Sequence, residues 1–175
     1  AKRFESFNTT VHFIAQTLKN KQAWVWDLDS GNRYKLLLDK NNGFTYDFGP
    51  TESLMVVFDH HKSGKVFKPL LITGEQAIDL SQEWDLELQH AQKGSTSHRR
   101  IAKLFDIKDD AELVDFSGIA IYRKTFNLSA KGNLTLNIGV VHGISELLVN
   151  GKSVGTRWYG RRLYDVSDYI QTGQN

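Results

Sequence analysis

Apolar residues return at every second position along most of this 175-residue chain, in runs short enough to be strands. The clearest runs lie within 33–38, 44–48, 54–58, 84–88, 122–128 and 134–140. Successive side chains of a strand point to opposite faces, so each run has one apolar face and one polar face. This pattern is typical of antiparallel sheets that cover a core on one side and meet water on the other.

Turn residues separate these runs. Asn42-Gly43 and Asn150-Gly151 each lie between strand-like segments, and Asn-Gly readily adopts the positive φ angles of a type I′ hairpin turn. Helical spacing predicts a helix over 99–106, and Ser167 to Gly173 is predicted to form a second short helical turn. Many short strands joined by turns predict an all-β fold, a β-sandwich or jelly roll.

A polar stretch at 60–65 separates the first block of strands from the second. We therefore predict a β-rich segment over 1–64, part of a sandwich, and a second domain over 65–175. The first block holds about five strands, few for a free-standing sandwich, because sheets need a covered face and open edges invite association. Residues 171–175 are similar to a turn that leads into a further strand, with an open pairing position near Asn175. These features predict a fragment of a larger protein, truncated at its C-terminus.

Charge and composition limit the partners. Twenty-two Lys and Arg against 20 Asp and Glu give a net charge of +2, and basic residues gather no further than Arg99-Arg100 and Arg161-Arg162. We therefore expect neither nucleic acid nor a membrane as a partner. No apolar stretch approaches the roughly 18 residues of a membrane span, and residues 1–20 lack the layout of a signal peptide. The absence of cysteine excludes a disulfide scaffold and a thiol nucleophile.

Motifs for cofactors and metals are missing from the sequence. Phosphate-loop, dinucleotide and Gly-x-Ser-x-Gly signatures are absent, so we expect no cofactor and no serine hydrolase of that type. The histidines include no pair with the spacing of zinc ligands, so we expect no metal site. Segment 27–32 is similar to a calcium loop, but Asn32 and Leu38 stand where an EF-hand requires Gly and Glu. An Asp-Ser-Gly turn is favoured there.

Sugar hydrolysis requires two carboxylates about 5 to 9.5 Å apart, one with a raised pKa. Glu83, Asp85 and Glu87 alternate on one strand face, which is more typical of a solvated face. We therefore assign no catalytic residue. A complete small glycosidase that uses a pair among Glu83, Glu87 and Asp165 stays open as an alternative.

Residues 157–165 concentrate aromatic and arginine side chains. Aromatic rings cover the apolar face of a sugar, and the fixed donors of arginine suit its hydroxyl groups. Because loops between strands commonly carry binding residues, this segment is a candidate carbohydrate-binding site. Its candidate contacts are Trp158, Tyr159, Arg161 and Arg162. The alternative interpretation places Trp158 and Tyr164 in the core, with Trp158 closing its end, and the arginines in surface ion pairs.

An ordered series of motifs runs through 117–175, in segments 117–126, 136–141, 148–158, 164–170 and 173–175. This series resembles the sugar-binding jelly roll of glycoside hydrolase family 2, in the version found near the C-terminus of large bacterial α-L-rhamnosidase-like enzymes. Segments 12–16, 26–31 and 49–58 are similar to the β-rich part that precedes this jelly roll. Where such domains commonly have prolines after the tryptophan, this chain has Gly160-Arg161-Arg162. This departure favours either a new ligand contact or a contact with another domain of the enzyme.

The resemblance implies a galactose-binding-domain-like fold from a secreted or periplasmic polysaccharide-degrading enzyme, whose catalytic barrel lies upstream. It assigns no catalytic acid to these motifs, so we expect a fragment with no active site of its own. The expected role is a non-catalytic accessory region of a glycoside hydrolase, which supports the catalytic domain of the parent enzyme and binds carbohydrate weakly. An autonomous lectin-like carbohydrate-binding module and the small complete glycosidase are the alternatives.

Overall fold

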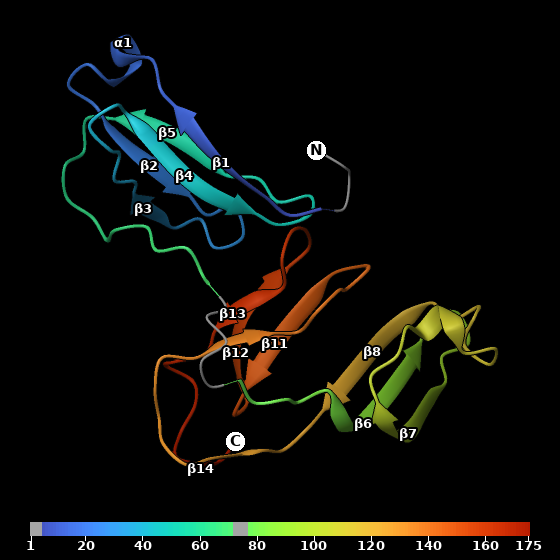
Figure 1. Ribbon diagram of the computed structural model, residues 1–175. Coiled ribbons are helices and arrows are strands. Elements are labelled where there is room, and N and C mark those ends of the chain that lie inside the picture. The colour runs from blue at the N-terminus through green and yellow to red at the C-terminus, as the bar shows by residue number, and fades with distance from the viewer. Residues whose placement is uncertain (1–4, 72–76) are drawn as a thin grey trace. The chain divides into compact units, whose positions relative to one another are not determined.

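The regular structure of the chain is almost entirely antiparallel β-sheet (Figure 1). This computed structural model describes residues 5–71 and 77–175. Contacts between residues divide the chain into two compact units: unit 1 is Ala1–Ile72 with Ala130–Gln171, and unit 2 is Thr73–Ser129 with Thr172–Asn175. The expected all-β fold of the β-sandwich class is confirmed. The domain boundary placed after Gly64 stays a prediction.

The first part of unit 1 is a small two-layered sandwich. Its elements are β1 (Phe7–His12), α1 (Ala15–Leu18), β2 (Gln22–Trp26), β3 (Arg33–Lys35), β4 (Gly43–Phe48) and β5 (Met55–Asp59). β1 pairs with β4, and β2 lies between β3 and β5, all antiparallel. Buried Ala23 and Val25 of β2 pack with Phe44 of β4 in one core. Because both sheets contribute to this core, they face each other across it.

Strand β2 is covered on both faces. Ala23 and Val25 face the shared core, whereas Trp24 faces the other way and is completely buried. Gly64 lies directly against the Trp24 ring, since a Cβ added at residue 64 would come within 2.5 Å of that ring. The polar stretch before residue 65 therefore includes a glycine that closes over this tryptophan.

The second part of unit 1 contains two short antiparallel pairs: β10 (Thr135–Asn137) with β13 (Leu163–Asp165), and β11 (Ser145–Val149) with β12 (Lys152–Arg157). Asn150 and Gly151 turn β11 into β12 with φ angles of 51° and 76°, as the Asn-Gly motif predicts. Buried Tyr164 of β13 donates a hydrogen bond from Oη to the carbonyl of Ser145 at 3.1 Å. The two pairs are thereby joined through one buried tyrosine.

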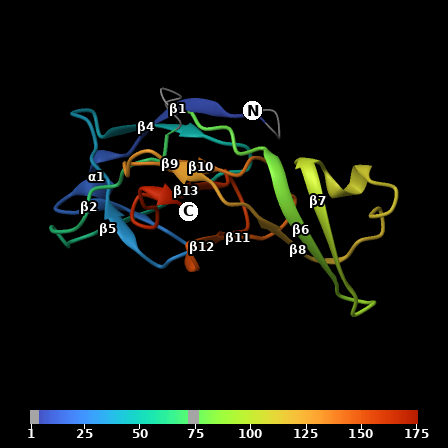
Figure 2. The same cartoon turned by 90° about the horizontal axis from the view of Figure 1, so that it is seen from below.

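Unit 2 is built on three long strands that lie side by side in both views (Figures 1 and 2). Its elements are β6 (Gln82–His90), β7 (Thr96–Lys103), a 3₁₀ turn at Ile107–Asp109, β8 (Gly118–Arg123), β9 (Asn127–Leu128) and β14 (Gly173–Gln174). Strand β6 is central, between β7 and β8. Leu86, Leu88, Ile101 and Leu113 form its buried core.

The structure corrects several local predictions. The helix predicted over 99–106 is wrong, because 96–103 is strand β7, and its hydrogen bonds to β6 outweigh the helical spacing. Asn42-Gly43 forms a turn, but the strands on either side of it, β3 and β4, pair with other strands. The segment from Ser167 forms only a turn over 167–169. Gly173–Gln174 is a short strand that pairs with β9, whereas the further strand expected after it stays a prediction.

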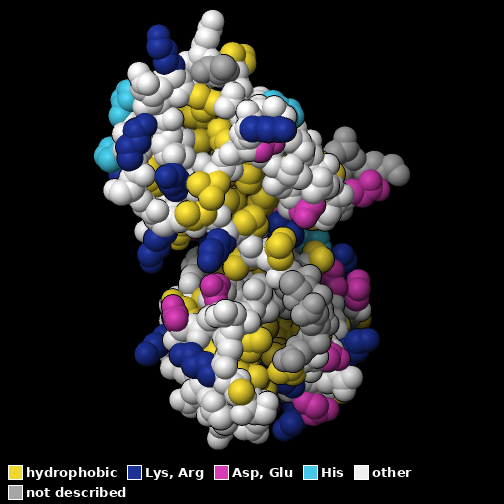
Figure 3. Space-filling view, turned by 60° about the vertical axis from the view of Figure 1, so that its left-hand side comes forward, with side chains coloured by type: hydrophobic (Ala, Val, Ile, Leu, Met, Phe, Trp, Pro, Cys, Tyr) yellow, Lys and Arg dark blue, Asp and Glu magenta, His cyan; other side chains and the backbone are white. Residues whose placement is uncertain are grey.

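Apolar side chains reach the surface in patches between lysines and arginines (Figure 3). The most exposed large apolar residues include Val140, Ile144 and Trp158. The expectation that Trp158 closes the core is therefore wrong, whereas the alternative placement of Tyr164 in the core is confirmed. Among the described residues, no helix has the length and apolar character that crossing a membrane requires.

Candidate functional site

All four predicted carbohydrate contacts lie in the loop that joins β12 to β13. Trp158 and Tyr159 form its outer part: Trp158 is 61% exposed, and its ring meets that of Tyr159 edge to face with 4.7 Å between centroids. The β11–β12 pairing ends at Ser145 opposite Arg157, and Ile144, which directly precedes Ser145, is also exposed. The loop thus presents an apolar and aromatic surface to solvent.

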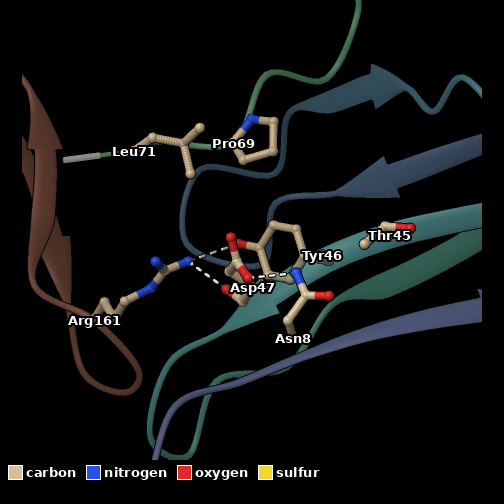
Figure 4. Close-up of a pocket in the computed structure, with 7 residues that line it drawn as sticks. All are labelled: Asn8, Thr45, Tyr46, Asp47, Pro69, Leu71 and Arg161. Atoms are coloured by element: carbon tan, nitrogen blue, oxygen red, sulfur yellow. Dashed lines mark hydrogen bonds between the residues drawn. The ribbon is translucent and has the colours of Figure 1, made fainter. Parts of the chain in front are cut away.

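Arg161 points inward from the same loop, toward the end of β4 (Figure 4). Its Nε donates to Oε2 of Glu52 at 2.9 Å, and its Nη2 donates to the carbonyl of Asp47 at 2.8 Å. The arginine stem lies against Gly49, where a Cβ would come within 2.3 Å of Arg161 Cγ. Glycine at position 49 is therefore what lets the arginine reach Glu52.

Glu52 organises this contact. Its Oε1 accepts a hydrogen bond from Tyr46 Oη at 2.9 Å, and its Oε2 also accepts one from the Gly49 backbone N–H at 2.6 Å. Burial, together with the charge of Glu52 and its hydrogen bond, raises the pKa of Tyr46 to about 12. Burial opposes the charge of Arg161, but the hydrogen bond and charge of Glu52 outweigh it and raise the pKa of the guanidinium.

Arg162 is buried, with 4% of its surface exposed. Its guanidinium donates to the carbonyls of Gly160 at 3.0 Å and Gly143 at 2.7 Å, with a longer bond of 3.5 Å to Val141. The side chain therefore ties the loop over 141–143 to the β12–β13 loop. Its Nη1–H and Nη2–H groups donate to backbone carbonyls and do not point to the surface. This arrangement suits a residue that holds the loop in place rather than one that contacts a ligand.

A second ion pair anchors the start of the loop. Arg157 Nη1 donates to Oδ2 of Asp29 at 2.7 Å. Asp29 belongs to the turn after β2, in which Asp27 accepts hydrogen bonds from the Asp29 N–H and the Ser30 hydroxyl. This is the predicted Asp-Ser-Gly turn, with Gly31 at a φ of 72°. Asp29, Tyr46 and Glu52 were not predicted as parts of the site, because no local sequence pattern pairs them with this loop.

A pocket of about 170 Å³ opens beside Arg161. In Figure 4, Pro69 and Leu71 lie on the side opposite Asn8 and Asp47. Asn8 Nδ2 donates to Oδ1 of Asp47 at 2.5 Å. The lining residues are Asn8, Thr45, Tyr46, Asp47, Pro69, Leu71 and Arg161. The pocket thus combines polar groups with an apolar wall, as sites for small ligands usually do.

The acidic residues of β6 form another candidate site, in unit 2. Glu87 pairs with Arg123 at 2.6 Å, and Glu83 pairs with Arg100 at 3.2 Å. The hydrogen bonds from Gln89 and Arg123 lower the pKa of Glu87. The groove on this face, which Asp85 also lines, is about 310 Å³. A carboxylate held ionised by an arginine is the opposite of a general acid, which needs a raised pKa.

Within the parts of the chain that the structure describes, no three His, Cys, Asp or Glu side chains gather as metal ligands. Several histidines have other partners. His60 contacts the carbonyl of Asn20 at 3.2 Å, and His61 lies 3.2 Å from the Asp59 carboxylate.

Comparisons with known proteins relate the chain to sugar-cleaving enzymes. No protein-family profile matches it. A protein of Formosa agariphila named "Putative beta-glucuronidase" is 33% identical over 120 residues, which are 65% of this chain and 10% of that protein. The structure of a rhamnosidase from Novosphingobium sp. PP1Y matches 97% of this chain with a TM-score of 0.66 and 24% identity.

The chain spans only 16% of that rhamnosidase, and these relatives are therefore far longer than the segment that matches them. The fold is shared with part of the rhamnosidase, and the sequence is related to part of the other protein. Together they support a domain like those of glycoside hydrolases. The closer resemblance to the family 2 jelly roll, and the position near a C-terminus, stay predictions.

Proposed function

We propose that the chain is a non-catalytic β-sandwich region of a carbohydrate-degrading glycoside hydrolase. In this proposal it supports the catalytic domain of that enzyme and contacts carbohydrate weakly through Trp158 and Tyr159. The observation that carries the proposal is that almost the whole chain matches a small part of a rhamnosidase. The relationship to a second protein named as a glucuronidase points to the same class of enzyme.

The carboxylates beside the two pockets favour a structural role. Glu52 is bound to Arg161 and Glu87 to Arg123, each within 3 Å. The hydrogen bonds from Gln89 and Arg123 lower the pKa of Glu87, whereas a glycosidase acid has to hold its proton near neutral pH. These ion pairs suit a rigid scaffold better than proton transfer to a glycosidic oxygen.

The aromatic pair suits the binding part of the proposal. Trp158 and Tyr159 offer ring surface, and an exposed ring can cover the C–H face of a sugar. Arg161 and Arg162 then act as positioning residues, because they fasten the loop to Glu52 and to the carbonyls of 141–143. Of the four predicted contacts, we therefore propose the two aromatic residues as the ones that form this surface contact with carbohydrate.

Hydrolysis tests the non-catalytic role. The purified chain is incubated with the 4-nitrophenyl glycosides of α-L-rhamnose and β-D-glucuronic acid. We expect no release of nitrophenol above the buffer rate. Turnover in the ordinary enzymatic range of about 1 to 1,000 per second, lost on Glu87→Gln or Asp165→Asn, would support a complete small glycosidase instead.

Binding tests the aromatic surface. Oligosaccharides that contain rhamnose or glucuronate are titrated into the chain and into Trp158→Ala, with binding followed by calorimetry. Trp26→Ala is the matched control, since Trp26 is also partly exposed but lies on β2. We expect weak binding that only Trp158→Ala reduces. Binding of equal strength in both variants would contradict the assignment, and micromolar binding without hydrolysis would favour an autonomous lectin-like module.

A further inference from the structure

We infer that the pocket beside Arg161 is a binding subsite for one neutral pyranose unit. The inference goes beyond the surface contact proposed for Trp158 and Tyr159, because neither residue lines this pocket. It depends on the size of the pocket, on the polar groups left available within it and on the apolar wall that faces them.

Size limits the ligand to a single ring. The pocket of about 170 Å³ lies below the roughly 300 to 1,000 Å³ of sites that enclose drug-sized molecules. All of its lining residues belong to unit 1. β1 and β4 supply four of these residues, and Arg161 comes from the β12–β13 loop. The β1–β4 pair and the ion-paired Arg161 therefore form much of the site, so it does not depend on one loop alone.

The polar wall has unused hydrogen-bonding capacity. Arg161 uses Nε and Nη2 for Glu52, Tyr46 and Asp47, whereas its Nη1 makes no hydrogen bond to any residue that the structure describes. Asp47 accepts from Asn8 through Oδ1, and within the same residues its Oδ2 accepts no hydrogen bond. A donor and an acceptor are thus both available, and the hydroxyl groups of a sugar can use both.

The opposite wall is apolar. Pro69 and Leu71 face the polar groups across the pocket in Figure 4, and Leu71 is 53% exposed. An exposed leucine beside converging polar groups is the arrangement that a pyranose fits, since a pyranose has C–H groups as well as hydroxyl groups. A methyl group at the sugar C6 position would add to this apolar contact.

Charge favours a neutral sugar over a uronic acid. The positive charge of Arg161 is compensated by Glu52 at 2.9 Å. Asp47 is the acidic residue among those that line the pocket, and its carboxylate forms no ion pair with any described residue, so a negative charge stands at the polar wall. A second carboxylate on the ligand would be repelled by Asp47, and like charges close together are unfavourable even near a protein surface.

Saturation-transfer NMR tests the inference, with methyl α-L-rhamnopyranoside as the neutral probe and sodium D-glucuronate as the acidic probe. We expect transfer to the rhamnoside, strongest at its methyl protons, and at least about tenfold less to glucuronate. Thr45→Trp fills the pocket from an exposed strand position and should reduce the rhamnoside signal by at least about tenfold. Thr96→Trp, at an exposed position on β7, is the matched control.

Asn8→Leu is a second pocket variant, used in case Thr45→Trp disturbs the β1–β4 pair. It should also reduce the rhamnoside signal. Trp158→Ala separates this inference from the proposed function: the rhamnoside signal should survive in Trp158→Ala and be lost in the pocket variants. A signal lost only in Trp158→Ala would overturn the pocket and leave the surface contact standing. No signal in the unaltered chain, or equal signals from both probes, would also overturn the inference.

Discussion

Arg161 donates from Nε to Oε2 of Glu52 at 2.9 Å, although the two residues are 109 positions apart in the sequence. This pair joins the β12–β13 loop to the turn that follows β4, inside unit 1. The side chains are 25% and 16% exposed, so solvent screens the pair only in part. The contact therefore connects the early and late segments of unit 1.

A double-mutant cycle measures the strength of this pair. Arg161→Met, Glu52→Gln and the double variant are compared by urea unfolding. We expect a coupling free energy of about 1 to 3 kcal/mol, as for a partly buried pair with charged hydrogen bonds. The control cycle uses Arg100 and Glu83, whose side chains are 70% and 56% exposed, and it should give less than about 0.5 kcal/mol. Equal coupling in both cycles would contradict a special role for Arg161 and Glu52.

Gly49→Ala should displace Arg161. The added methyl group would lie 2.3 Å from Arg161 Cγ, so either the arginine stem or the turn has to move. We expect a loss of about 1 to 3 kcal/mol in unfolding free energy, typical of overpacking. In an Arg161→Ala background the same substitution should cost much less. Gly132→Ala is the control, because a Cβ there meets no atom within 4 Å.

Tyr46 should ionise late in an alkaline titration followed by tyrosinate absorbance. Its pKa is raised from 10.0 to about 12, so the folded state holds the phenol proton more tightly than the unfolded state does. The resulting stability is fully present below about pH 10 and is lost as the pH rises through about 12. Tyr46→Phe should remove the late step, and Glu52→Gln should lower its pKa. A late step that persists in Tyr46→Phe would assign it to another tyrosine.

Arg162 should matter for stability and Trp158 should not. Arg162→Met leaves the carbonyls of Gly143 and Gly160 without this donor, and we expect a loss of about 1 to 3 kcal/mol. Trp158→Ala changes an exposed side chain and should cost less than about 0.5 kcal/mol. Urea unfolding gives both values, and hydrogen exchange over 139–144 should rise only in Arg162→Met. The reverse order of stabilities would contradict the assigned roles.

The sequence pattern predicted strands where local alternation and sheet pairing agree. Trp84, Leu86 and Leu88 alternate on β6, and the last two are buried in the core of unit 2, as expected. At β7 the same approach failed, because clustered apolar residues fit a helix as well as a strand. Ile101 lies opposite Trp84 in the observed register, and this nonlocal pairing decides the outcome.

The sequence predicted where the candidate site lies, but not which residues its arginines pair with. A run of aromatic and arginine residues marked the β12–β13 loop, and this run indeed lies between two strands. Glu52 and Asp29 could not be paired with Arg161 and Arg157 from the sequence, since ion pairing between distant positions follows from the tertiary fold. The same limit explains the failed prediction for Trp158, whose exposure depends on what the rest of the chain covers.

Unit 1 is discontinuous in sequence, with 73–129 inserted between its two segments. A ribosome adds about 5 to 20 residues per second, so a nascent chain exposes Glu52 for several seconds before Arg161 leaves the exit tunnel. During that interval the inserted unit 2 residues are already available to fold. During synthesis, the strands of the first sandwich are therefore made well before Arg161. Until that later segment is made, the charge of Glu52 has no arginine to compensate it.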